Sequence, residues 1–524
     1  MNSLHKKYTG YVVSQTHWDR EWYLTFQEFR VRLIELMDQL LELLERDPKY
    51  KSFTTDGQTI MLADYLEIRP EKKEIIKRLI KEGRLHIGPW YVLPDEFLVS
   101  PEALVRNLMI GHQQADELGH PMKVGYIPDP FGHISTLPAI LQGFNIDSAL
   151  FGRGMGDEGA ILPSEFIWEA PGGEQVLAIH LITGYGNLAG LGLRDFDRNW
   201  GAVQEVDYEY AYEKAAAVFT EMKAKTTTPA LLFNNGSDHL LPQPELPELL
   251  VYLNRKLPEI DFVHSDYVAF IQAVRDHKPE LETYRGEMRG ARFNNLLPGV
   301  LSARMYLKQA NQCCQQKLEK YAEPISAWSQ VFANHKSQDS LLWYAWKLLI
   351  QNHPHDSICG CSIDQVHREM VVRFDQVEQI ADAITENGLQ VLCQAIDTTG
   401  SESGYALVVF NPHNWEVSST AICSLQLPQP LESSVVQDSE GHIVQSQISG
   451  DWVIREQGKP LEYLHKITFA VDVPAGGYKT YWLVPGKEEV ATNLSYEDGL
   501  LENEHLQVEF KLDGTLSALI TRVC

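Results

Sequence analysis

The feature that most constrains the fold is an alternation of short apolar segments with amphipathic helices, which continues to about Asp276. The helical pattern is clear over Phe26–Leu44, where an apolar residue recurs every three or four positions. Such alternation is typical of parallel βαβ units, with helices covering both faces of a sheet or the outside of a barrel. We expect strands over residues 10–14, 53–56, 85–87, 124–127, 148–151, 230–234 and 262–264.

The pattern changes twice in the rest of the chain. Residues 278–396 contain long helical stretches with few strand signals, which predicts a helical bundle. From residue 397 onward, short alternating strands predict an antiparallel β-sandwich. A hairpin pattern close to Cys524 opens a further sheet, so we expect this last domain to be incomplete at the C-terminus. The sequence therefore predicts three domains: an α/β domain over 1–277, a helical bundle over 278–396 and the β-sandwich over 397–524.

Charge and cysteine content restrict the partners and the compartment. The chain carries 45 Lys and Arg against 71 Asp and Glu, a formal net charge of −26. This charge disfavours nucleic acids and anionic membranes and favours a neutral substrate or a bound cation. The seven cysteines show no disulfide framework, which predicts a reducing, cytoplasmic location. No apolar run approaches the ~20 residues that would span a bilayer.

Asp129 occupies an unusual position at the end of a predicted strand. It lies between Pro128 and Pro130, and a residue that precedes a proline is restricted to extended geometry. Neither proline can continue a central ladder of hydrogen bonds, because proline has no N–H. The segment therefore holds a carboxylate rigidly at a strand end, although an ordinary Asp-Pro turn would have the same sequence.

Other polar residues also follow predicted strands. His17 and Asp19 lie two positions apart after the first strand, so their side chains point to the same face. An imidazole and a carboxylate that converge in this way suit Zn²⁺ or a similar divalent cation. Asp238 and Arg153 also follow strands, and the carboxyl ends of parallel strands gather on one edge, where active sites form. A solvated turn would account for each residue taken alone.

A His-Pro-His-Asp segment follows a predicted helix in the bundle. Pro354 prevents that helix from continuing, so we expect His355 to lie in a bent loop that reaches toward the α/β domain. Cys359 and Cys361 follow closely and would be able to ligate a metal as thiolates, although small buried cysteines are the commoner case.

Taken together, five motifs resemble glycoside hydrolase family 38, the retaining α-mannosidases, and look closest to its bacterial branch. The motifs occur in the order HWDREW, YIPDPFGH, ALFGRG, NNGSDH and HPHDSICGCS. The resemblance covers roughly residues 8–480 and implies a seven-stranded α/β barrel, a helical bundle and β domains, with residues of the C-terminal β domains near the site.

The resemblance also implies roles for individual residues. The family's zinc ligands match His17, Asp19, Asp129 and His355, which would hold one divalent ion. Two imidazoles and two carboxylates would accept Co²⁺ as well. Asp129 matches the nucleophile and Asp238 the acid/base, although Ser237 stands where many relatives have another aspartate. Trp22 matches an aromatic platform beneath the sugar, and Arg153 and Asp356 match residues that line the same subsite.

The resemblance therefore implies a metal-assisted hydrolase that removes terminal α-linked mannose from oligosaccharides or small mannosides. A retaining mechanism requires two carboxyl groups ~5–5.5 Å apart, one nucleophilic and one protonated. Two other classes stay open: a metal-dependent polysaccharide deacetylase, and a mannoside-binding protein without catalysis. A homodimer through an exposed bundle is also expected.

Overall fold

The computed structural model describes residues 7–194, 205–399, 404–429, 431, 433–456, 459–487 and 493–521. The chain divides into two compact units. The first contains the described residues up to Ala322 together with Gln338–Ile384, and the second contains Glu323–Ser337 and the described residues from Thr385 onward. Within these ranges, every helix is too short or too polar to cross a membrane.

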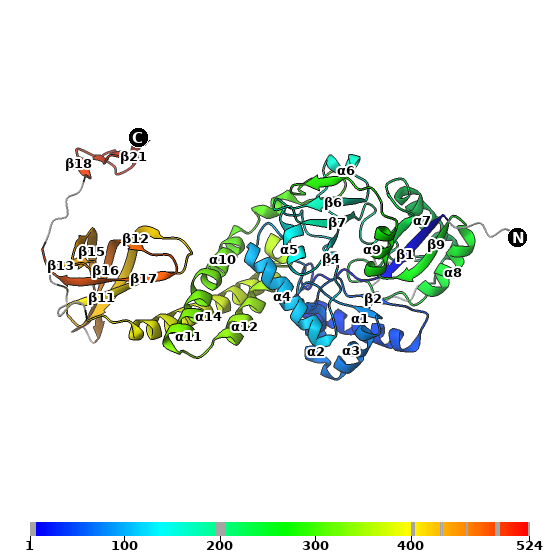
Figure 1. Cartoon of the computed structure of the whole chain (residues 1–524), viewed down its shortest axis with the longest axis horizontal. Helices are drawn as coiled ribbons and strands as arrows, with labels where there is room; N and C mark the ends of the chain where they lie inside the picture. Colours follow the sequence, from blue (N-terminus) through cyan, green and yellow to red (C-terminus); the bar gives the residue numbers. More distant parts are fainter. Residues whose placement is uncertain are drawn as a thin grey trace. The chain divides into compact units, whose positions relative to one another are not determined.

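Parallel strands form the centre of the first unit, as the alternating pattern predicts (Figure 1). In the first sheet, β1 lies between β8 and β9 and is parallel to both. A two-stranded parallel sheet joins β2 to β3, and a third sheet has the order β10–β6–β7–β5–β4. The strands are β1 (Tyr8–Ser14), β2 (Phe53–Thr54), β3 (Leu85–His86), β4 (Gly125–Tyr126), β5 (Ser148–Phe151), β6 (Glu165–Glu169), β7 (Gln175–His180), β8 (Ala230–Asn235), β9 (Ile260–Ser265) and β10 (Thr283–Arg285).

The third sheet contains strands that the sequence pattern did not reveal. β6 and β7 pair antiparallel as a hairpin, whereas the other pairs in this sheet are parallel. The hairpin is short and its strands are almost continuously buried, so it lacks the alternation of a surface hairpin.

Amphipathic helices surround these strands. In α1, Thr25 caps the N-terminus in a capping box with Glu28, and the leucines of its inner face, including Leu36 and Leu40, are fully buried. The helices of this region are α1 (Phe26–Arg46), α2 (Ile60–Ile68), α3 (Lys73–Lys81), α4 (Pro101–Leu118), α5 (Leu137–Gly143), α6 (Glu158–Ile161), α7 (Tyr208–Met222), α8 (Leu246–Lys256) and α9 (Tyr267–Asp276).

Helices follow the α/β region, as predicted. They are α10 (Met305–Gln316), α11 (Glu323–Ala333), α12 (Asp339–Ile350), α13 (His355–Cys359) and α14 (Asp364–Ala395), with a π-helical turn over Lys317–Ala322. In the first unit, Leu349 and Ile358 share an apolar cluster with Tyr91 and Phe131 of the α/β region. The segment that carries His355 is therefore packed directly against the loops that follow the parallel strands.

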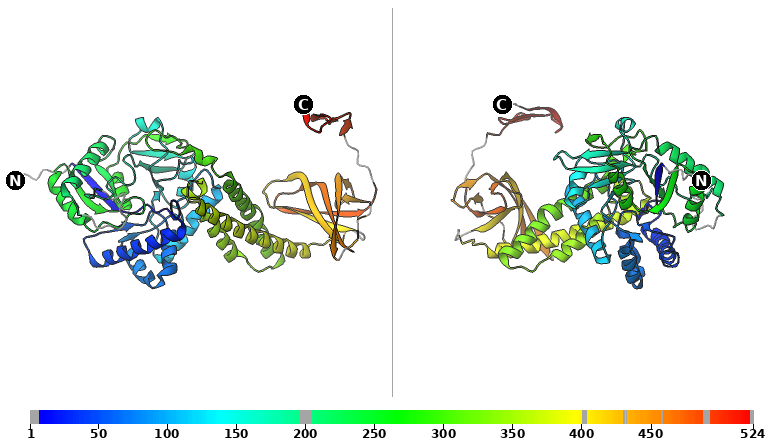
Figure 2. Two further views of the ribbon diagram at one scale, coloured as in Figure 1. Left: turned by 180° about the vertical axis from the view of Figure 1, so that it is seen from behind. Right: turned by 45° about the vertical axis from the view of Figure 1, so that its right-hand side comes forward.

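The second unit contains antiparallel sheets, also as predicted (Figure 2, yellow to red). Leu407, Val436, Ile467 and Tyr481 belong to one apolar cluster that both larger sheets share. Those sheets have the orders β11–β17–β13–β14 and β12–β16–β15, and a third has the order β18–β19–β20–β21. The strands are β11 (Tyr405–Asn411), β12 (Val417–Leu427), β13 (Ser434–Gln437), β14 (Ile443–Val444), β15 (Ser446–Glu456), β16 (Lys459–Val473), β17 (Gly477–Pro485), β18 (Ser495–Glu497), β19 (Leu500–Glu502), β20 (Leu506–Phe510) and β21 (Leu516–Thr521).

Candidate active site

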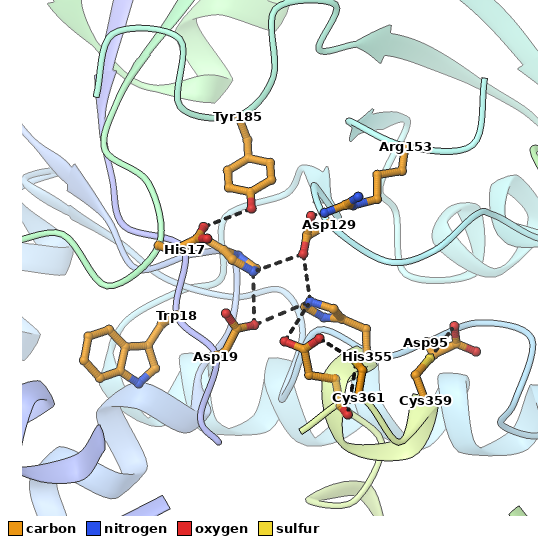
Figure 3. Close-up of polar contacts among 12 residues, drawn as sticks. His17, Trp18, Asp19, Asp95, Asp129, Arg153, Tyr185, His355, Cys359 and Cys361 are labelled. Atoms are coloured by element: carbon orange, nitrogen blue, oxygen red, sulfur yellow. Dashed lines mark hydrogen bonds and ion pairs between the residues drawn. The ribbon is translucent and has the colours of Figure 1, made fainter. Parts of the chain in front are cut away.

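The polar residues predicted at the strand ends lie together in the first unit (Figure 3). His17 and Asp19 follow β1, Asp129 follows β4, and Asp238 follows β8. The backbones of His17 and Asp238 form an isolated parallel bridge that extends the pairing of β1 with β8. Parallel pairing therefore brings side chains that are more than a hundred residues apart in sequence to one place.

His355 reaches the same place from the helical region. It is the first residue of α13, so the bent loop expected after Pro354 is the entry to a short helix. Pro94 bridges Pro354, and the N–H of Asp95 donates a hydrogen bond to the carbonyl of His353. These backbone contacts fix the segment against the loop that follows β3.

Two imidazoles and two carboxylates converge there. His17 Nε2 lies 3.2 Å from Asp19 Oδ1 and 3.8 Å from Asp129 Oδ2. His355 Nε2 lies 3.4 Å from the same atom of Asp19 and 3.0 Å from the same atom of Asp129. Nε2 of each imidazole thus faces both carboxylates, and all four side chains are buried.

This arrangement fits a divalent cation. Ligand atoms held about 2.0–2.2 Å from a tetrahedral ion lie roughly 3.3–3.6 Å apart, within the range of the four observed distances. His17 Nε2 is buried and makes no hydrogen bond among the described residues. Two overlapping groups have ligand atoms within 4.8 Å of one another: His17 with Asp129 and His355, and Asp19 with His355 and Asp356.

The charges of this cluster hold its members ionised. Burial alone would lower the pKa of His17, but the carboxylates of Asp56 and Asp19 outweigh it and raise that pKa well above its usual value. Burial opposes the charge of His355 as well, yet the neighbouring carboxylates raise its pKa to about 9. A bound cation would take the place of these imidazolium charges, because histidine binds metal in its neutral form.

Asp129 is the most constrained of the carboxylates. Its Oδ1 accepts a hydrogen bond of 2.7 Å from Arg153 Nε, while its Oδ2 faces the two imidazoles. Burial would raise the pKa of Asp129, but the hydrogen bond to His355 and the charges of His355, His17 and Arg153 outweigh it and lower the pKa. This carboxylate is therefore held as an anion.

Asp238 has the opposite electrostatic environment. It is partly exposed, and its Oδ1 accepts a hydrogen bond of 2.9 Å from the hydroxyl of Tyr185. Burial raises the pKa of Asp238, and the negative charges of Asp19 and Asp129 raise it further. Two carboxyl groups in one site are thus driven toward different protonation states, which is the arrangement that acid–base chemistry requires.

Two of the three predicted substrate-binding residues, Arg153 and Asp356, border the cluster. Arg153 contacts Asp129 as described, and Asp356 Oδ2 lies 3.7 Å from His355 Nε2. Burial and the charges of Asp19 and Asp129 raise the pKa of Asp356 to about 7 against the opposing charge of His355. Trp22 is partly buried, and its carbonyl accepts a hydrogen bond from the N–H of Ile363.

Neither cysteine of the Cys-Gly-Cys segment belongs to a group that could hold a metal ion among the described residues. The thiol of Cys359 donates to Asp95 and that of Cys361 to Asp356. Burial raises the pKa of Cys359 well above its usual value, so this thiol stays neutral.

Two residues that contact the cluster were not singled out in the sequence. Asp56 follows β2 and hydrogen-bonds the ring of His17, and Tyr185 lies between β7 and α7. Burial raises the pKa of Asp56, although the charge of His17 opposes this. Its place after a strand was a usable signal for Asp56, whereas Tyr185 stands in an irregular segment without one.

Comparison with known proteins identifies the class. Residues 7–287 match the domain described as Glycosyl hydrolases family 38 N-terminal domain, and residues 295–392 match the Alpha mannosidase middle domain. The first match covers more than half of the chain. The chain therefore belongs to glycosyl hydrolase family 38, as its motifs predict.

Similar proteins carry related names. A putative mannosylglycerate hydrolase from Halalkalibacterium halodurans is 40% identical over 418 residues, which is 77% of this chain and 45% of that protein. Human alpha-mannosidase 2C1 is 24% identical over 433 residues, which is 81% of this chain and 38% of that protein. The chain thus spans less than half the length of these curated relatives.

Among solved structures, an alpha-mannosidase from Enterococcus faecalis V583 superposes with a TM-score of 0.86 at 32% identity. The match covers 98% of this chain and 60% of that one. A second structure, described as a protein in the glycosyl hydrolase family 38 from Enterococcus faecalis, has a TM-score of 0.78 at 31% identity. It covers 98% of this chain and 59% of that chain.

Proposed function

We propose that this chain carries the catalytic centre of a retaining α-mannosidase. The observation that carries the proposal is the convergence of His17, Asp19, Asp129 and His355, with Asp238 beside them in an environment that favours its protonated form. Membership of family 38 supports the same reaction class. The substrate would be a terminal α-linked mannose on an oligosaccharide or a small mannoside, and the name of one relative makes mannosylglycerate a candidate.

We assign the four converging side chains to one divalent cation, with zinc as the first candidate. Two imidazoles and two carboxylates suit zinc in coordination number and ligand type, and cobalt is accepted by the same donors. When bound, the cation would act as a Lewis acid toward the C2 and C3 hydroxyls of the sugar. Neighbouring cis hydroxyls distinguish mannose from glucose, so this contact would select the manno configuration.

Asp129 is the nucleophile in this proposal. Its carboxylate is held ionised and is fixed on one side by Arg153, which leaves little freedom to turn away from the sugar. In the first step, a carboxylate oxygen of Asp129 forms a bond to the anomeric carbon while the glycosidic C–O bond breaks. Asp238 donates its proton to the departing oxygen, so the aglycone leaves as a neutral alcohol.

The second step restores both carboxyl groups. Asp238, now ionised, accepts a proton from a water molecule, and the resulting oxygen displaces Asp129 from the anomeric carbon. Two inversions leave the configuration of the released mannose unchanged. Tyr185 keeps Asp238 in position throughout, because its hydroxyl donates to one carboxyl oxygen of that residue.

The finer architecture follows from the same proposal. We assign the parallel strands to a seven-stranded barrel, with domains over 1–277, 278–396 and 397–524. Two isolated parallel bridges support it: Gln15–Thr54 joins the end of β1 to β2, and Gln58–Trp90 extends the pairing of β2 with β3. Trp22 and Asp356 would line the mannose subsite together with Arg153. The six cysteines that the structure describes are free, which supports a reducing cytoplasm as the location.

Hydrolysis of an aryl α-mannoside and an aryl α-glucoside, each with and without a chelator, tests the function. We expect turnover of the mannoside alone and its loss with the chelator. A 2-fluoro mannoside should label Asp129. A label on another residue would overturn the assignment of Asp129. Release of acetate from an acetylated glycan without release of mannose would indicate a deacetylase instead. Mannoside binding without turnover that Asp129→Asn leaves unchanged would indicate a binding protein.

A further inference from the structure

Asp56 contacts the far side of the His17 ring, away from the cluster. Its Oδ1 and Oδ2 lie 3.1 and 3.0 Å from His17 Nδ1, and both side chains are completely buried. When Asp56 is ionised, its carboxylate can only accept, so Nδ1 of His17 carries the proton of this hydrogen bond. In the neutral ring that binds a metal, Nε2 is then the nitrogen with a free lone pair, and it is this atom that faces Asp19 and Asp129.

Two further donors fix the carboxylate of Asp56. The N–H of Trp18 donates to Oδ2 at 2.7 Å and Gln58 Nε2 donates to it at 2.9 Å. Gln58 Nε2 also donates to the carbonyl of Trp18 at 2.8 Å, which closes a small buried network. A carboxylate that contacts His17 Nδ1 and accepts from the N–H of Trp18 and from Gln58 cannot rotate without losing one of these contacts.

The backbone aims Asp56 at His17. Asp56 has φ 53° and Gly57 has φ 66°, so the chain turns sharply as it leaves β2. A side chain at Gly57 would meet the ring of Tyr126 at 3.1 Å, which leaves this position to glycine. An aspartate tolerates the left-handed region better than most residues, and here the turn directs its carboxylate back toward β1.

We propose that Asp56 is a positioning residue that sets the tautomer and the ring orientation of His17 for cation binding. The inference rests on the proposed metal site. A carboxylate behind a metal-ligating imidazole holds the ring and makes the free nitrogen a better ligand, and loss of such a partner weakens metal affinity by about 10–100-fold. His355 has no such partner, since its Nδ1 makes no hydrogen bond among the described residues. The effect is therefore specific to His17.

Asp56→Asn tests this with little change in shape. Oδ2 receives two N–H donors, so an asparagine keeps them only if its NH₂ group faces His17. An NH₂ group facing Nδ1 favours the tautomer of His17 with its proton on Nε2, and that proton opposes the binding of a cation there. In the opposite orientation of the asparagine amide, its NH₂ group faces Trp18 and Gln58, and these two buried donors lose their acceptor.

The measurement is the affinity for Zn²⁺ alone, by competition with a chromophoric chelator at fixed pH. We expect Asp56→Asn to weaken binding by about 10–100-fold. Glu165→Gln is the matched control, because Glu165 is also buried and accepts a backbone N–H and two hydroxyls, but it lies outside the cluster. It should leave the affinity unchanged.

The outcomes separate this inference from the proposed function. If His17→Gln weakens Zn²⁺ binding and Asp56→Asn does not, the role of Asp56 is wrong and the metal site stands. If His17→Gln has no effect, the metal site itself is wrong. Should Asp56→Asn fail to fold, nitrogen NMR of the unaltered Zn²⁺-loaded protein decides: a proton on Nδ1 of His17 supports the inference, and a proton on Nε2 overturns it.

Discussion

The two histidines of the His-Pro-His segment provide a sharp test of the site. They lie two residues apart and both are buried, but only His355 faces the cluster. The ring of His353 lies 2.7 Å from Asn311 Oδ1, and His353 belongs to neither of the two candidate metal-ligand groups among the described residues. His355→Gln should therefore weaken cation binding, and His353→Gln should leave it unchanged although it disturbs the same segment.

The expected magnitude follows from the number of ligands. Zinc sites with four protein ligands bind with roughly 10–16 kcal/mol, which is about 2.5–4 kcal/mol for each ligand. At about 1.4 kcal/mol for a factor of ten, removal of His355 should weaken Zn²⁺ binding by roughly 10²–10³-fold. Glutamine retains a polar side chain of similar reach, so the burial of the segment changes little.

Chelator competition with Zn²⁺ at one fixed pH measures both variants against the unaltered protein. Urea unfolding measures how much each substitution lowers the free energy of unfolding. This comparison separates the loss of a metal ligand from a general destabilisation of the segment. The reasoning is refuted if His353→Gln weakens binding as much as His355→Gln, or if His355→Gln binds as tightly as the unaltered protein.

Three further predictions concern the acid, the pH dependence of stability and the core. Tyr185→Phe removes a hydrogen bond that favours the ionised form of Asp238, so the pKa of Asp238 should rise. The alkaline limb of the pH profile of kcat/KM should therefore move to higher pH. A limb that does not move would argue against Asp238 as the acid. Burial lowers the pKa of His353 to about 3, below the ~6.5 of an unfolded chain, so the stability contribution of this residue is complete above pH ~6.5 and is lost as the pH falls toward 3. Urea unfolding at neutral and acid pH should show this loss, and His353→Gln should reduce it. Leu40→Ala in the buried face of α1 should cost about 2–5 kcal/mol, whereas Val31→Ala on the exposed face of the same helix should cost under ~0.5 kcal/mol; equal costs in urea unfolding would contradict the assigned face.

The strands and the strand-end residues were predictable because both depend on local patterns. A short apolar run that ends at a polar residue indicates a buried parallel strand, and the carboxyl ends of such strands meet on one side. His17, Asp129 and Asp238 were therefore expected to lie close together before any coordinates were known. The two-residue spacing of His17 and Asp19 also carried information, because alternate side chains of an extended segment share a face.

Other features depend on contacts that no local pattern encodes. The β6–β7 hairpin is buried on both faces, so it lacks the alternation that reveals a hairpin. Asp56 follows a strand of only two residues, and its importance lies in a hydrogen bond to a ring 39 residues away. Tyr185 reaches Asp238 across 53 residues from an irregular segment. In each case the sequence contains the residue, but only the fold supplies its partner.

The position of His355 shows how the helical region completes the site. Glu21 follows Asp19 by two residues, is completely buried, and accepts hydrogen bonds from Ser357, two residues after His355, and from Arg373 of α14. Glu21 and Arg373 form an ion pair, and removing Arg373 would leave the buried charge of Glu21 uncompensated. This ion pair therefore holds the segment of Asp19 against the helical region independently of a cation. A cation that binds only the assembled site would stabilise the folded state by a further ~2.7 kcal/mol at a concentration 100 times its Kd. Binding of a cation would therefore be thermodynamically linked to the attachment of α13 to the loops of the α/β region. Substitutions at Glu21 or Arg373 should then weaken cation binding without altering a ligand.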